Sequence, residues 1–398
     1  MQRLAIGIDI GGQSSKCGVV TQDGTILEQS VVTSLVDSFD EYLKLLAETV
    51  KDLVRKTADR GVAVGIGIGA PNANRLDGTI RYAPNLRWAR GADGKPGVIY
   101  LADRLEEATG LHVRITNDAN AAARGERTYG IAKGIDDFIM ITLGTGVGSG
   151  IISHGRLVYG HDGFAGELGH VCVEQNGRQC NCGLKGCLET YASAMGVART
   201  AREFLQKDSR ESLLRKLDPE KISSKDIYDA AVQGDAMAKE IFSYTGRILG
   251  RAMGDFVKFS SPQAIVLFGG LTKSREFLEK DSRESLLRKL DPEKISSKDI
   301  YDAAVQGDAM AKDIFVFTGR ILGRAMGDFV KFSSPQAIVL FGGLTKSREF
   351  FHDEMVQAMN DNLMQVWKGQ IQILYSSLKE SDAAILGASS MVWSPDEV

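Results

Sequence analysis

Four side chains that bind soft metal ions lie close together in the segment 163–190. One is a histidine and three are cysteines: His170, Cys180, Cys182 and Cys187. Thiolates combined with an imidazole are a common ligand set for tetrahedral zinc. Because four protein ligands leave no open position for water, the pattern predicts a structural zinc site within residues 170–187 rather than a catalytic one. The alternative is a group of buried or free thiols.

Two carboxylates flank this cluster, Glu167 on one side and Glu189 on the other. Their placement favours a metal-stabilised scaffold that holds acidic side chains toward a ligand, rather than a free-standing zinc finger. The chain has five cysteines in all, and the odd number argues against a disulfide framework. A thiolate-rich metal site is typical of the reducing cytoplasm, where we expect this protein to reside.

Glycine-rich turns follow two predicted strands. The first is the run from Asp9 to Gly11 and Gly12, and the second contains Gly144, Thr145 and Gly146. Such turns can offer backbone amides to phosphate, and the Asp9 carboxylate could hold magnesium through water. Neither turn is a Walker P-loop, and each alone could be a permissive turn. Together, one in each lobe, they predict a nucleotide held from opposite sides.

Polar residues also occupy positions where an α/β protein binds its ligand. Asn117 and Asp118 stand where a predicted strand gives way to a helix, and an Asp there faces the crevice at the carboxyl ends of the strands. Either residue could instead cap the helix, and both roles are compatible. Asn85 lies in a loop where its amide could contact hydroxyls, although by itself it indicates only a turn.

Composition limits the classes of function. The 398 residues are 43% hydrophobic with a net charge of −3, which is ordinary for a globular protein of two or three domains. This charge gives no reason to expect nucleic acid or an anionic membrane as a partner. The chain opens directly on a predicted strand, and we expect no signal peptide, membrane span or preceding DNA-binding domain.

Strands and helices are predicted to alternate along the first half of the chain, which indicates an α/β protein of two lobes. The hydrophobic pattern predicts strands at 4–10, 17–21, 25–32, 62–68, 113–116, 138–143 and 150–153, and helices at 39–58, 97–109 and 119–130.

A long internal repeat dominates the second half, because residues 202–274 recur as residues 275–347. The copies differ at four pairs of positions: Gln206/Glu279, Glu240/Asp313, Ser243/Val316 and Tyr244/Phe317. Each copy predicts a helix, a long helix and a strand. In the first copy a helix capped by Ser224 is followed by a long helix from Asp235 and a strand at 263–270.

One fold has room for a single copy of this segment. We therefore expect one copy in the sheet and the other extruded, a hybrid that begins in one copy and finishes in the other, or exchange between protomers. The sequence leaves open which copy fills the core and whether the repeat is natural or engineered.

The motifs Asp9-Ile-Gly-Gly12 and GELGH…CNCGLKGCLE, the latter within residues 166–189, resemble the ROK (repressor, open reading frame, kinase) group of bacterial sugar kinases. The resemblance covers essentially the whole chain once one copy of the repeat is removed. It implies the two-lobed α/β fold of actin-like, ribonuclease H-like ATPases. The lobes would be residues 1–120, closed by a helix at about 381–398, and residues 121–380.

The resemblance also implies roles for individual residues. Asp118 would be the catalytic base for a hexose 6-hydroxyl, and Gly342-Gly343 or Gly269-Gly270 would form the adenosine-side turn. The sugar hydroxyls would be contacted by Asn85, Asn117, Glu167, His170 and Glu189. It further implies ATP with Mg²⁺, a structural Zn²⁺, a homodimer and a place in carbohydrate metabolism such as glycolysis.

Two positions depart from the usual pattern of this group. Gln13 stands where a threonine is usual, and Asn72 stands where a glycine is common. The best expectation is a glucokinase-like hexose kinase. Alternatives are an N-acetylhexosamine kinase, a fructokinase, a non-catalytic sugar-binding or regulatory protein, or a duplicated chain whose ATP site is impaired.

Overall fold

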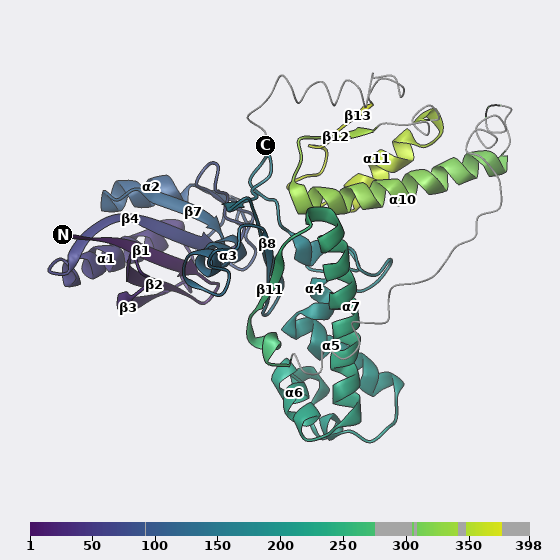
Figure 1. The fold of residues 1–398 in the computed structure, drawn as a ribbon, viewed down its shortest axis with the longest axis horizontal. Coiled ribbons are helices and arrows are strands. Elements are labelled where there is room, and N and C mark those ends of the chain that lie inside the picture. The colour runs from purple at the N-terminus through teal and green to yellow at the C-terminus, as the bar shows by residue number, and fades with distance from the viewer. Residues whose placement is uncertain (92, 275–304, 306–308, 341–347, 376–398) are drawn as a thin grey trace. The chain divides into compact units, whose positions relative to one another are not determined.

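The computed structural model describes residues 1–91, 93–274, 305, 309–340 and 348–375 (Figure 1). The chain divides into two compact units, Met1–Leu286 with Lys331–Ser334, and Leu287–Val330 with Pro335–Val398. The lobe boundary predicted near residue 120 falls inside the first unit, between two sheets. None of the helices in the described ranges has the length and apolar composition that crossing a bilayer requires.

The first sheet of this unit has the strand order β3-β2-β1-β4-β7 (Figure 1). An antiparallel meander of β1 (Gln2–Ile10), β2 (Ser14–Thr21) and β3 (Ile26–Thr33) is extended by β4 (Gly61–Ala70) and β7 (Val113–Asn117), which run parallel to β1. Alternate residues of β1 are buried, as period-two patterning requires.

Two helices pack against the buried face of this sheet, α1 (Phe39–Lys56) and α2 (Leu101–Thr109). The Ser38 side chain caps α1 by accepting the Glu41 N–H, and Tyr42 of α1 stacks on Trp88 with 4.0 Å between ring centroids. The helix predicted from residue 97 begins only at Leu101. Residues Val98–Ile99 form β6 instead, which pairs with β5 (Ile80–Arg81) and uses their extended backbone.

The second sheet has the order β10-β9-β8-β11 and includes the second glycine turn. Its strands are β8 (Phe138–Leu143), β9 (Val147–Ser153), β10 (Arg156–Leu157) and β11 (Ala264–Phe268), and α3 (Asp118–Tyr129) contacts both sheets. The strand predicted from residue 150 starts earlier, at Val147, because Val147 pairs with Leu143. The glycine turn is therefore a tight connection of three residues.

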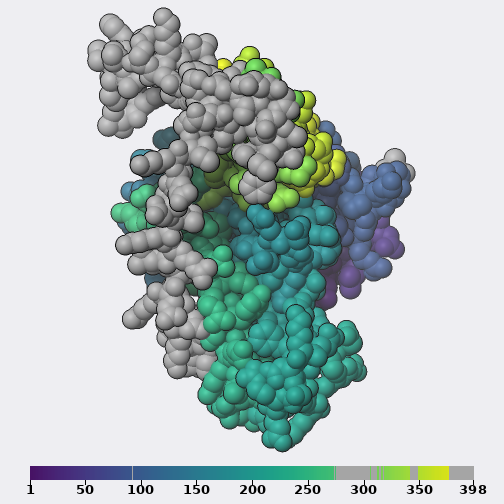
Figure 2. Space-filling model, turned by 90° about the vertical axis from the view of Figure 1, so that its right-hand side faces the viewer, coloured from purple at the N-terminus to yellow at the C-terminus, as the bar shows by residue number. Residues whose placement is uncertain are grey.

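Helices cover the second sheet and form a core with it. They are α4 (Glu189–Ala192), α5 (Ala194–Lys207), α6 (Ser224–Val232) and α7 (Ala236–Ser260), with short 3-10 turns at Leu168–His170, Leu213–Lys216, Pro219–Lys221 and Gly270–Ser274. In Figure 2 the teal and green residues of α5 to α7 form one continuous packed mass. Ser223, rather than the predicted Ser224, caps α6, and its capping box with Asp226 fixes the helix start there.

The two copies of the repeat occupy different places in the structure. The strand of the first copy, β11, pairs in parallel with β8. The second copy provides α10 (Ala309–Ser333) and β12 (Ala337–Leu340), and β12 pairs with β13 (Gln372–Tyr375) in the second unit, which also contains α11 (His352–Asp361). Because Lys331–Ser334 belong to the first unit, that unit contains residues from both copies, while the repeat strand in its sheet comes from the first copy. Gly342, Gly343 and the expected helix at 381–398 lie outside the described residues.

Candidate active site

Asp118 is held at the junction of β7 and α3. The Asn117 Oδ1 atom accepts the Ala119 N–H at 2.9 Å, and the Asp118 Oδ1 atom accepts the same N–H at 2.8 Å. Asn117 therefore caps the helix, as one of the two sequence-based roles requires, and Asp118 stands at its first position. That Asp118 faces a ligand stays a prediction. Loss of hydration raises the pKa of Asp118, and repulsion from Asp9 adds to this shift despite the Ala119 hydrogen bond.

The parallel pairing of β1, β4 and β7 brings Asp9 to the same end of the sheet as Asp118. In the register of β1, β4 and β7, Asp9 lies opposite Gly69, and Gly69 lies opposite Thr116. The glycine turn that follows β1 packs on the loop of Asn85. A Cβ atom at Gly12 would lie only 2.8 Å from the Asn85 carbonyl oxygen, so this approach requires glycine. Asn85 itself is exposed.

The predicted metal ligands converge as the spacing indicated. One potential ligand atom from each of His170, Cys180, Cys182 and Cys187 lies within 4.8 Å of the others. The Cys182 and Cys187 sulfurs are 3.7 Å apart, and the Cys180 sulfur is 3.7 Å from His170 Nδ1. A tetrahedral ion with Zn–S bonds of about 2.3 Å separates its sulfurs by about 3.8 Å. The donor set and its dimensions thus fit zinc, with His170 Nδ1 on the metal side.

Glu189 connects this cluster to the glycine turn between β8 and β9. Its Oε2 atom accepts the Val147 N–H at 3.1 Å, and its Oε1 atom lies 3.7 Å from the Cys180 sulfur. Burial raises the pKa of Glu189, although nearby His170 opposes the shift. The carboxylate is therefore fixed between Gly146-Val147 on one side and the cysteine loop on the other.

Backbone hydrogen bonds from the second repeat copy hold the loop of Glu167. The Glu167 N–H donates to the Lys331 carbonyl at 3.0 Å, and the Gly166 N–H donates to the Phe332 carbonyl at 3.1 Å. Burial raises the pKa of Glu167, His170 lowers it, and repulsion from Asp118 and Glu189 raises it further. These mutual effects show that the predicted acidic side chains share one electrostatic environment.

Two cavities adjoin Asn117, Glu167 and Glu189, and another of about 890 Å³ is lined in part by Asp9. A space of about 20 Å³, large enough for one water molecule, lies between α3 and the Glu167 loop and is lined in part by Asn117. A larger cavity of about 280 Å³ is lined by residues that include Thr145, Gly146 and Glu189. The second glycine turn and one predicted sugar-contacting carboxylate therefore face the same space.

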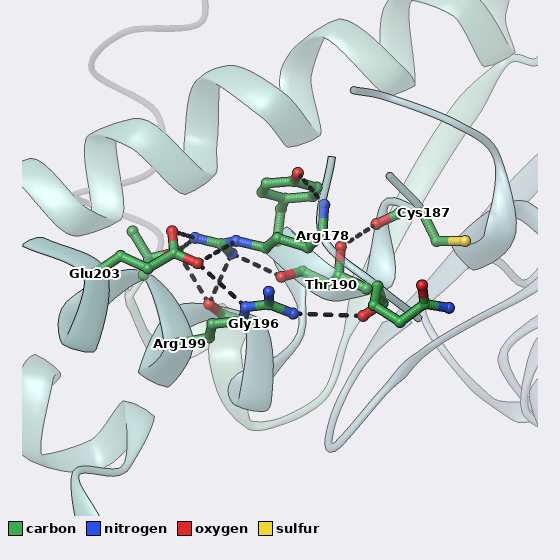
Figure 3. Close-up of polar contacts among 9 residues, drawn as sticks. Arg178, Cys187, Thr190, Gly196, Arg199 and Glu203 are labelled. Carbon is green, nitrogen blue, oxygen red and sulfur yellow. Dashed lines mark hydrogen bonds and ion pairs between the residues drawn. The ribbon is translucent and has the colours of Figure 1, made fainter. Parts of the chain in front are cut away.

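Sequence reasoning missed Arg178, which is 7% exposed and lies at the centre of a polar network (Figure 3). Its guanidinium donates to the Thr190 and Gly196 carbonyls, to Thr200 Oγ1 and to both oxygens of Glu203. In the sequence, Arg178 has no feature that separates it from an ordinary loop residue, because its partners lie 12 to 25 positions further along the chain. Its position two residues before Cys180 was the one available signal.

Comparison with known proteins identifies the family. The ROK family model matches residues 5–291 and, with overlap, residues 278–394. The chain belongs to the ROK family. Among ROK relatives, a glucokinase of Thermotoga maritima is 36% identical over 76% of this chain and 95% of its own length. A glucokinase of Streptomyces coelicolor is 36% identical over 72% of this chain and 87% of its length.

Solved structures of ROK proteins share this fold. A ROK family glucokinase from Streptomyces griseus, in complex with glucose and AMPPNP, has a TM-score of 0.57 at 33% identity and covers 73% of this chain and 92% of its own. The ROK family also contains regulators, since a xylose repressor of Bacillus subtilis is 28% identical over 71% of this chain and 68% of its own length. The predicted family and its actin-like ATPase fold are thus confirmed.

Proposed function

We propose that this protein is an ATP-dependent hexose kinase that phosphorylates the 6-hydroxyl, with glucose as its preferred sugar. The observation that carries the proposal is a cluster of four carboxylates. Repulsion from Asp9 raises the pKa of Asp118, and repulsion from Asp118 and Glu189 raises the pKa of Glu167. One carboxylate can serve as a base while the others accept hydrogen bonds from the remaining hydroxyls. The glucokinase relatives support the same assignment.

In the proposed reaction Asp118 takes the proton of the 6-hydroxyl while the hydroxyl oxygen bonds to the γ-phosphorus of ATP. The bond from that phosphorus to the bridging oxygen breaks, and ADP leaves with the electron pair. The raised pKa of Asp118 makes its carboxylate a better proton acceptor. Asp9 would hold the Mg²⁺ that accompanies ATP, and the turns at Gly11-Gly12 and Gly144–Gly146 would direct amides at its phosphates.

The hexose would be recognised by Asn85, Asn117, Glu167, His170 and Glu189. Zinc, when bound, would supply structural cross-linking only, because its four ligands leave no open position. His170 would bind it through Nδ1, which leaves Nε2 for the sugar. Gly269, which follows β11 with a φ of +108°, would form the adenosine-side turn with Gly270. We also propose that the protein works as a homodimer in the reducing cytoplasm.

The test is ADP release by the purified chain with magnesium-ATP and a panel of sugars: glucose, mannose, fructose, N-acetylglucosamine and N-acetylmannosamine. We expect release that depends on glucose and falls by about 10²- to 10⁴-fold in Asp118→Asn, because that variant lacks the base. Asp103→Asn, an exposed change in α2, is the matched control and should retain activity.

Each alternative predicts a different outcome. Preference for an N-acetylated sugar or fructose would reassign the substrate within the same reaction class. The regulator alternative, which the repressor relatives favour, predicts sugar binding in calorimetry without ADP release from any sugar. That result from folded protein would refute the kinase proposal.

A further inference from the structure

Arg178 is a buried arginine whose five N–H groups all have acceptors. The Nε–H donates to Glu203 Oε1 at 3.1 Å, Nη1 donates to the Thr190 and Gly196 carbonyls at 2.7 and 3.2 Å, and Nη2 donates to Thr200 Oγ1 and Glu203 Oε2 at 2.8 and 2.7 Å. A guanidinium has five donors, so none remains for another ligand. All five donors of Arg178 thus bind acceptors within the protein, two backbone carbonyls and three side-chain oxygens (Figure 3).

The partners of Arg178 lie on segments that need external support. Helix α4 has only four residues, so it is too short to pair all of its own carbonyls within the helix. Arg178 supplies a partner for the Thr190 carbonyl, and its guanidinium lies 4.3 Å from the centre of the Tyr191 ring. The Arg178 N–H also donates to the Tyr191 hydroxyl at 3.0 Å. Arg178 therefore contacts two consecutive residues, Thr190 and Tyr191, which directly follow Glu189 in the chain.

Arg178 is also part of the cysteine loop. Its carbonyl accepts the Gly186 N–H at 2.8 Å, which closes the loop that contains Cys180 and Cys182. The Thr190 hydroxyl donates to the Cys187 carbonyl at 2.8 Å. These contacts join the last metal-ligand position to α4, and the Arg178 side chain joins both to α5 through Glu203.

We infer that Arg178 is a positioning residue that sets the place of the Glu189 carboxylate and the shape of the cysteine loop, and thereby the affinity for the sugar. This inference rests on the proposed function for its kinetic consequence. The connection from Arg178 to the glycine turn is short. Arg178 binds the Thr190 carbonyl, Thr190 directly follows Glu189, and Glu189 accepts the Val147 N–H after the turn. A lysine cannot replace the arginine, since an ammonium has three donors and no planar fork for the Glu203 carboxylate.

The experiment compares Arg178→Lys with the parent chain. We expect the KM for the sugar to rise about 10- to 100-fold, as changes to groups that orient a site usually produce, while the KM for ATP changes less than about 2-fold. Arg210→Lys, which alters an exposed ion pair with Glu240, is the matched control. A residue that acts only on overall stability would not separate the two KM values below the melting temperature.

A second measurement does not depend on catalysis. Ellman's reagent with EDTA reports the rate at which the cysteines become accessible, and we expect this rate to increase at least about 10-fold in Arg178→Lys. If Arg178→Lys does not fold, Thr200→Val and Glu203→Gln each remove one partner and should shift both quantities in the same direction.

Unchanged thiol rates and an unchanged KM for the sugar in these folded variants would overturn the inference. If the parent releases no ADP with any sugar, the proposed function fails and the thiol rates alone decide the role of Arg178. Equal rates in parent and variant would then refute it, and a faster rate in the variant would support it.

Discussion

Gly146 provides the sharpest test of how the glycine turn and the sugar site are joined. A Cβ atom at this position would overlap Glu189 Oε2 and lie 3.2 Å from the carboxyl carbon. Because carbon and oxygen atoms need more than 3 Å between them, the carboxylate in Gly146→Ala would have to move by about 1 Å. That movement would break the hydrogen bond from the Val147 N–H to Glu189.

The expected loss of stability is at most that of one hydrogen bond, and the expected loss of activity is about 100-fold. Glu189 Oε2 is the end of a flexible, partly exposed side chain that can rotate away, so the loss of unfolding free energy should stay within the ~1.5–3 kcal/mol of one charge-assisted hydrogen bond. A displacement of 1 Å in a positioning group can cost about 10²-fold in rate, or about 2.7 kcal/mol of transition-state stabilisation. We therefore expect kcat/KM for the sugar to fall about 100-fold.

The assay is coupled ADP release for kcat/KM, together with urea unfolding for stability. Gly125→Ala in α3 is the control, because nothing lies within 4 Å of its would-be Cβ atom. That change should stabilise the helix by about 0.4–1 kcal/mol and leave kcat/KM unchanged. If Gly146→Ala keeps kcat/KM within about threefold of the parent, or if Gly125→Ala loses as much, the proposed link between the turn and Glu189 is wrong.

Three further predictions follow from the same structure. Loss of hydration and repulsion from Asp9 raise the pKa of the Asp118 carboxyl, so its ionisation disfavours the folded state as pH rises through that pKa. Asp118→Asn should therefore melt at a higher temperature than the parent at pH 7, and the difference should disappear below about pH 4. A difference that does not change with pH would contradict this. The purified parent should contain about one zinc per chain in mass spectrometry, and a chelator or Cys182→Ser should remove it and lower the melting temperature in calorimetry. Equal melting with and without metal would refute a structural role. Deletion of residues 275–347 joins Ser274 to Arg348 and so keeps the Ser-Arg junction that follows the second copy. The strand β11 can then take the place of β12 beside β13, and we expect one cooperative unfolding transition and activity at least equal to the parent. An unfolded product would contradict this.

The sequence by itself determined the local features of this protein. The closeness of His170 to the three cysteines, the two glycine turns and the position of Asp118 at a strand-to-helix junction all follow from residue types at short spacing, and the structure contains them. Zinc binding and catalysis by Asp118 stay predictions. Alternating or continuous apolar runs likewise predicted the strands of both sheets, except the two-residue β10 (Arg156–Leu157). The errors fell at element ends: Val98–Ile99 extends to pair with Ile80–Arg81, and β9 begins at Val147 because Leu143 faces it.

Only the tertiary structure decided the contacts between distant segments. Val147 and Glu189 meet across 42 positions, and the carbonyl of Lys331 supports a loop more than 160 residues earlier. The repeat shows the physical reason most clearly, since β11 and β12 have the same residues and hence the same local preferences. Closing the longer loop to β12 costs only about 0.4 kcal/mol more, so chain entropy hardly distinguishes the copies. Packing of the whole unit selects which copy pairs with β8, and no local pattern contains that information.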